Sequence, residues 1–132
     1  MREKRDENMS EIWPTQIKVA KDRQRLTVAF NDGAAYELSA EMLRVLSPSA
    51  EVKGHGPGQE VTVPGKRDVA ILSVLPTGNY AIRIGFDDGH DTGIFTWSYL
   101  RDLGERGGEL FGAYERQLAE KGMSRDVGER PR

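Results

Sequence analysis

The sequence predicts a single small α+β domain, rich in β-structure, with two pseudo-repeated strand–turn–strand–helix units plus a C-terminal helix. Three observations support this fold class. The chain has 132 residues, 37% of them hydrophobic, which is one domain's length with enough apolar content to fold. Several short segments alternate apolar and polar residues, the period of a half-buried strand. Residues 29–46 and 85–103 share, in the same order, a Phe, an Asp-Gly turn, a strand, a short helix and a Leu-Arg pair.

The first unit is predicted to be a three-stranded meander followed by a helix. Alternating apolar residues predict strands at about 16–21, 25–31 and 35–38. The Asn-Asp-Gly sequence at 31–33 predicts a tight turn between the last two strands, because glycine adopts a positive φ at no steric cost. Ser39 is a suitable N-cap for a short helix at 40–46.

The second unit follows a glycine-rich loop at 51–60. Residues 69–75 are apolar at every position except Ser73, as in a strand buried on both faces, and we expect this strand at the centre of the sheet. Further strands are predicted at 61–63, 80–86 and 93–97. A short helix at 98–104 and an amphipathic helix at 105–121 are predicted to complete the domain, since apolar residues recur in the last segment every three or four positions.

Composition limits the domain boundaries and the classes of partner. Residues 1–11 and 122–132 are highly charged and predict disordered tails around a domain at 12–121. With 19 Lys and Arg against 21 Asp and Glu, no basic excess favours nucleic acid as the partner. The sequence lacks both a long apolar run and a secretory signal, so we expect a cytoplasmic protein without membrane contact.

The absence of cysteine excludes disulfides, thiolate metal sites and a cysteine nucleophile. Two segments that each carry a histidine remain as candidates for a binding surface: the loop GHGPGQ at 54–59 and the turn DDGHDTG at 87–93. The candidate surface residues are Lys53, Gly54, His55, Gly56, Gly58, Asp88, His90, Asp91 and Thr92.

An alternative hypothesis is a metal site formed by His55, His90 and Asp91, because two histidines and one carboxylate are the ligands of many ferrous iron sites. Adjacent residues of a strand point to opposite faces, so His90 and Asp91 would reach one ion only if the turn backbone is irregular. The competing interpretation is a plain turn whose Asp side chains accept hydrogen bonds from backbone amides.

Two common enzyme motifs are absent from the sequence. Before Gly65-Lys66 the glycine that a phosphate-binding P-loop requires is replaced by Glu60, and Arg67 replaces its hydroxyl residue. No Gly-x-Ser-x-Gly nucleophile motif occurs either. A non-catalytic protein is therefore the favoured interpretation.

The segments LRVLSPSAEVKGHGPGQ (43–59) and GNYAIRIGFDDGHDTGIFTWSYL (78–100), with a Pro-x-x-Ile sequence at 14–17, resemble the gamma-butyrobetaine hydroxylase-like N-terminal domain family. The resemblance spans about 13–121, and stand-alone bacterial members of this family have no known function. It implies a small accessory module, in some relatives bound to zinc through three cysteines after the Leu-Arg pair and one histidine after the Asp-Gly turn.

In this chain His90 matches the histidine of the resemblance, but Ser47, Ser49 and Val52 occupy the cysteine positions. We therefore expect no zinc, because structural zinc sites depend on thiolates, whereas iron stays open as a cofactor. A related domain is fused behind P-loop iron–sulfur carrier proteins, and the resemblance thereby implies an accessory role in iron–sulfur or iron metabolism. The resulting hypothesis is a non-catalytic binding or adaptor domain whose partner is another protein, with a metal-binding protein or metal-dependent enzyme at His55, His90 and Asp91 as the alternative.

Overall fold

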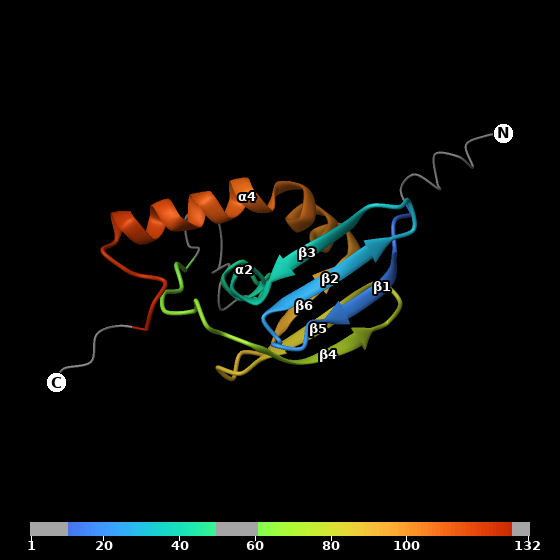
Figure 1. The fold of residues 1–132 in the computed structure, drawn as a ribbon, viewed down its shortest axis with the longest axis horizontal. Helices are drawn as coiled ribbons and strands as arrows, with labels where there is room; N and C mark the ends of the chain where they lie inside the picture. Colours follow the sequence, from blue (N-terminus) through green and yellow to red (C-terminus); the bar gives the residue numbers. More distant parts are fainter. Residues whose placement is uncertain (1–10, 50–60, 128–132) are drawn as a thin grey trace.

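The computed structural model describes residues 11–49 and 61–127. In these ranges the chain forms two three-stranded antiparallel sheets, each followed by a helix, which confirms the predicted α+β class (Figure 1). The first sheet and its helix are β1 (Pro14–Val19), β2 (Arg25–Phe30), β3 (Ala35–Ser39) and α2 (Ala40–Val45). The second sheet and its helix are β4 (Ile71–Thr77), β5 (Ala81–Phe86), β6 (Gly93–Thr96) and α4 (Trp97–Glu120).

The two halves repeat each other down to single hydrogen bonds. In the turn after β2, the Phe30 amide donates to the Ala34 carbonyl at 2.8 Å; in the turn after β5, the Phe86 amide donates to the His90 carbonyl at 2.9 Å. Gly33 and Gly89, at the same place in the two turns, have φ angles of 94° and 91°. The predicted pseudo-repeat is therefore present in the backbone.

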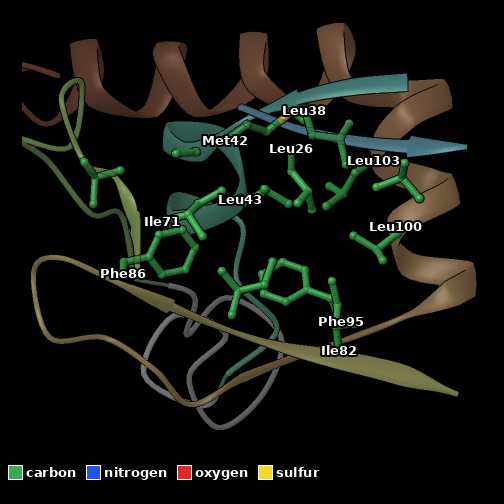
Figure 2. Packing of buried hydrophobic residues seen from close by; sticks show 14 of the residues in the cluster. Leu26, Leu38, Met42, Leu43, Ile71, Ile82, Phe86, Phe95, Leu100 and Leu103 are labelled. Carbon is green, nitrogen blue, oxygen red and sulfur yellow. The ribbon is translucent and has the colours of Figure 1, made fainter. Parts of the chain in front are cut away.

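The core lies between the two sheets and is closed by α2 and the first turns of α4. Figure 2 shows leucines of the first sheet and of α4 pointing toward isoleucine and phenylalanine side chains of the second sheet. Phe30 and Phe86, which end β2 and β5, are 3% and 2% exposed, so the two repeats contribute equivalent anchors. The largest fully buried side chains are Phe86, Phe95, Leu26, Leu43, Ile71, Ile84, Leu100, Leu103 and Val28.

Each repeat also holds the turn of the other through an arginine on its helix. Arg44 of α2 donates from Nε to Asp88 in the second turn at 2.7 Å. Arg101 of α4 donates two hydrogen bonds to Asp32 in the first turn, at 3.1 and 2.9 Å. The two repeats are thus joined by a reciprocal pair of contacts in addition to their shared core.

The structure corrects three of the predicted elements. The strand that contains 71–75, β4, lies at an edge of its sheet, since the order is β4-β5-β6. Its apolar residues are not buried on both faces, because Leu72 and Leu75 are exposed. Residues 61–63 form no strand; instead the Val63 carbonyl accepts a hydrogen bond from the Tyr114 hydroxyl of α4 at 2.5 Å. The helices expected at 98–104 and 105–121 are one continuous helix, α4, which continues through Gly104.

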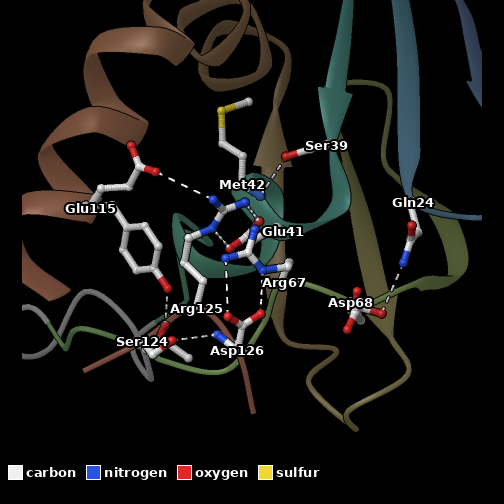
Figure 3. Close-up of polar contacts among 12 residues, drawn as sticks. Gln24, Ser39, Glu41, Met42, Arg67, Asp68, Glu115, Ser124, Arg125 and Asp126 are labelled. Atoms are coloured by element: carbon white, nitrogen blue, oxygen red, sulfur yellow. Dashed lines mark hydrogen bonds and ion pairs between the residues drawn. The ribbon is translucent and has the colours of Figure 1, made fainter. Parts of the chain in front are cut away.

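Residues 122–127 are held against the domain beyond the predicted boundary at 121. The Gly65 amide donates to the Ser124 carbonyl at 2.9 Å, and the Arg67 amide donates to the Arg125 carbonyl at 2.9 Å. Arg125 also makes two hydrogen bonds, at 2.8 and 2.7 Å, to Glu41, a buried residue of α2 (Figure 3). Residues 1–10 and 128–132 of the predicted tails lie outside the described residues. Within the described ranges, no helix has the length and apolarity that crossing a membrane would require.

Candidate functional site

The turn that carries all four of the described candidate residues connects β5 to β6, at positions 87–92. Two aspartates support its backbone: the His90 amide donates to Asp88 Oδ1 at 3.1 Å, and the Ala70 amide donates to Asp87 Oδ1 at 3.1 Å. The Asp88 bond is the local side-chain-to-backbone hydrogen bond that favours aspartate in turns, whereas the Asp87 bond ties the turn to the segment before β4. The turn is consequently fixed at both ends before any partner binds.

His90 points from this turn into the protein and meets two serine hydroxyls. Its Nε2 lies 3.1 Å from Ser47 Oγ and 3.3 Å from Ser49 Oγ. His90 and Ser49 are each 6% exposed, and Ser47 is fully buried. Gly93 leaves room for the cluster, since a Cβ there would lie 2.2 Å from Ser47 Oγ. The imidazole and both hydroxyls therefore form a hydrogen-bonded group inside the domain.

These three side chains do not fit the zinc site that the resemblance implies. The serines occupy two of the implied cysteine positions and do converge on His90, so the spacing of that site is retained. Structural zinc takes thiolates and imidazoles, however, and a neutral hydroxyl cannot replace a thiolate in a closed tetrahedral site. The distances here are those of hydrogen bonds between the groups themselves. Val52, the third position, lies outside the described residues.

Asp88 forms ion pairs with two cations at the edge of the turn. Its carboxylate contacts Lys66 Nζ at 2.6 Å and Arg44 Nε at 2.7 Å, and its side chain is only 18% exposed. Burial alone would raise the pKa of Asp88, but hydrogen bonds from Lys66, the His90 amide and Arg44, with the charge of Arg44, lower the pKa to about 2. Asp88 is therefore ionised at neutral pH, with two cations as partners.

Asp91 and Thr92, by contrast, are exposed on the outside of the turn. A Cβ on Gly85 of β5 would lie 3.5 Å from Asp91 Cβ and 2.6 Å from Ser73 Oγ, so Asp91 lies over the outer face of the second sheet. His90 points to the inner side. The two adjacent residues thus point to opposite sides, as the alternation of an extended chain implies.

The other candidate residues are not placed. Lys53, Gly54, His55, Gly56 and Gly58 lie outside the described residues, so the proximity of the glycine-rich loop to the turn stays a prediction. In the part of the chain that the structure describes, no three histidine or acidic side chains are grouped so that they could hold a metal ion. The metal set of His55, His90 and Asp91 likewise stays a prediction.

The sequence did not predict the partners of Asp88 and His90. The contact of Arg44 with Asp88 could have been found from the repeat, because Arg101 and Asp32 occupy the equivalent positions. The resemblance had already aligned Ser47 and Ser49 with ligand positions, which was a signal that they meet His90. Lys66 had no comparable signal, since it lies in an irregular segment.

Comparisons with known proteins give one family and several solved structures. The family model described as gamma-butyrobetaine hydroxylase-like, N-terminal, matches residues 17–101. Two proteins with NMR solution structures share 45% and 38% sequence identity with the chain, each with a TM-score of 0.75; the matches cover 89% and 92% of this chain and 92% and 94% of theirs. A crystal structure of a DUF971-family protein of unknown function from Acidithiobacillus ferrooxidans ATCC 23270 shares 38% identity over 69% of this chain and 91% of its own, with a TM-score of 0.57. No curated protein matches the chain.

Proposed function

The chain belongs to the gamma-butyrobetaine hydroxylase-like N-terminal family, and on this premise we propose that it is a non-catalytic binding module that acts as an adaptor through contacts with another protein. The family relation leaves the role open, because the DUF971 relative is itself a protein of unknown function. The proposal therefore rests on the geometry of the turn at 87–92.

One observation carries the proposal: the groups of this turn that could perform chemistry are bound to other groups inside the domain. A catalytic base has to reach a proton of the substrate, yet the His90 imidazole is 6% exposed and its Nε2 contacts two serine hydroxyls. The Asp88 carboxylate is likewise engaged by Lys66 and Arg44. The turn presents to solvent the carboxylate of Asp91 and the hydroxyl of Thr92, together with Asp87, whose Oδ1 accepts from the Ala70 amide.

A rigid turn with an exposed carboxylate suits recognition of a protein surface that carries Lys or Arg. The proposed surface includes this turn and the loop at 53–58, whose position the structure does not describe. We further propose that the partner belongs to iron–sulfur or iron metabolism, a view supported by the fusion of related domains to iron–sulfur carriers.

Metal binding distinguishes this proposal from its alternative. We expect the protein to retain neither ferrous iron nor zinc after anaerobic titration, desalting and elemental analysis. One ion per chain in the wild type that is lost in His90→Asn would overturn the proposal and favour a metal-binding protein or metal-dependent enzyme. Asp32→Asn, which changes the equivalent turn of the first repeat, controls for general destabilisation of the domain.

The binding surface is tested by photo-cross-linking in the cells from which the chain derives. A cross-linking residue is placed at Asp91 and, as the matched control, at Ala35, the exposed residue at the same position after the first turn. We expect one protein partner to be cross-linked from 91 and not from 35. We also expect the purified partner to bind about tenfold more weakly to Asp91→Arg than to Ala35→Arg. Equal cross-linking from both positions, or none from 91, would contradict a binding role for the turn.

A further inference from the structure

The outer face of the second sheet carries an arginine between two exposed aliphatic side chains. Leu75 of β4 is directly opposite Arg83 of β5, which is directly opposite Ile94 of β6. The row faces outward, because the neighbours of Arg83 in β5, Ile82 and Ile84, are buried in the core. Leu75 is 46% exposed and Ile94 is 41% exposed. We call these three residues the outer row.

The outer row continues the surface of the turn at 87–92. Gly85 is the last residue but one of β5, just before the turn. It lies two residues from Arg83, which is about 7 Å along a strand. Asp91 covers Gly85 on this same outer face. An anionic group, a cationic group and aliphatic side chains thus lie together on one side of the second sheet.

The repeat supplies an internal comparison that separates fold from function. The residues of the first sheet at the same positions as the outer row are Lys18, Thr27 and Glu37, which also lie opposite one another on three strands. Since that sheet folds with polar side chains at these positions, the architecture does not require leucine and isoleucine there. The apolar character of the outer row calls for another explanation.

Arg83 is exposed, and no carboxylate of the described residues forms an ion pair with it. A guanidinium between aliphatic groups selects a carboxylate on the partner, because the two groups form charge-assisted, bidentate hydrogen bonds and any other group would leave the covered charge unpaired. A second copy of the chain, related by a two-fold axis through this row, would instead bring its own Arg83 close to this one, which is unfavourable.

We infer that the outer row is the docking surface for a different protein, which places an Asp or Glu carboxylate on Arg83 and aliphatic side chains on Leu75 and Ile94. The inference rests on the proposed binding role and extends its surface from the turn across the second sheet. It names the chemistry of the partner: a segment with a carboxylate flanked by aliphatic residues.

Photo-cross-linking from the outer row tests the inference in the full chain. The cross-linking residue is placed at Ile94 and, as the matched control, at Glu37 of the first sheet. We expect a partner to be cross-linked from 94 and not from 37, through a peptide that contains Asp or Glu beside aliphatic residues. Arg83→Glu should reduce this cross-linking about tenfold, whereas the matched change Thr27→Glu should leave it unchanged. Thermal unfolding of each variant confirms that it is folded.

The outcomes separate this inference from the proposed function. Cross-linking from 91 but not from 94 would overturn the docking role of the outer row while the turn remains a binding surface. Absence of cross-linking from both positions would overturn the two proposals together. Cross-linking from 94 that Arg83→Glu leaves unchanged would overturn the claim that a carboxylate of the partner binds Arg83. A dimer in analytical ultracentrifugation that Arg83→Glu dissociates would assign the surface to a second copy and contradict the inference.

Discussion

Asp88→Asn is the substitution that most directly probes how the two repeats are held together. The variant keeps the size of the side chain and removes the charge that contacts Lys66 at 2.6 Å and Arg44 at 2.7 Å. A pKa that falls from 3.8 in the unfolded chain to about 2 in the folded protein corresponds to about 2 kcal/mol of stabilisation, since one pKa unit is worth about 1.4 kcal/mol. Solvent screening at the edge of the turn reduces this, and we expect the variant to lose about 1–2 kcal/mol at pH 7.

The pH dependence gives the same interaction a second signature. Because the folded pKa lies below the unfolded value, the contribution of Asp88 is fully present above about pH 4 and disappears as the pH falls toward 2. The wild type and Asp88→Asn should therefore differ in stability at pH 7 and converge near pH 2.

Urea unfolding followed by circular dichroism at both pH values measures this difference. Asp32→Asn is the matched control: Asp32 has the equivalent position, but its side chain is 39% exposed and is paired with one arginine, so its loss should be smaller. An Asp88→Asn variant as stable as Asp32→Asn at pH 7, or one equally destabilised at pH 7 and pH 2, would refute the reasoning.

Four further substitutions test the packing of the domain. Gly93→Ala should destabilise the domain by about 2–3 kcal/mol in urea unfolding, since the new Cβ would lie 2.2 Å from Ser47 Oγ; an unchanged midpoint would contradict this contact. Gly104→Ala should also destabilise the domain, because its Cβ would lie 2.4 Å from the ring of Tyr36 in β3. Gly108→Ala, in the same helix, meets nothing within 4 Å and should stabilise the domain by about 0.5–1 kcal/mol. Thermal unfolding that places the two variants in the opposite order would refute the packing of α4. Arg125→Gln should cost about 3 kcal/mol in urea unfolding, because it leaves a carboxylate of α2 that is 6% exposed without its charged partner; a loss below about 1 kcal/mol would show that residues 122–127 contribute little to the fold.

Most of the fold follows from local patterns in the sequence. The Asp-Gly turns, the Ser39 cap and the alternation of the strands are local signals, and the similarity of 29–46 to 85–103 extends them to the level of whole units. The place of β4 could not be predicted in the same way. Consecutive apolar residues look alike whether they are buried on both faces or exposed on one, and Leu72 and Leu75 are exposed.

The candidate site was predicted in part, because its chemistry depends on contacts between distant segments. The sequence singled out His90 and Asp91 from one turn, but the neighbours that decide their roles come from elsewhere in the chain. Ser47 lies 43 residues before His90, and Arg44 lies 44 residues before Asp88. The outer row could not be recognised from composition, since its three residues become neighbours only through the register of the second sheet.

The central claim is that the turn at 87–92 and the outer row form one surface for protein recognition. The most direct test is a titration of the isotope-labelled chain with its purified cross-linked partner, followed by backbone amide chemical shifts. The account predicts that the changes cluster at Leu75, Arg83, Asp91 and Ile94 and are absent from Lys18, Thr27 and Glu37 of the first sheet. Changes that occur on the first sheet instead, or equally on both sheets, would contradict it.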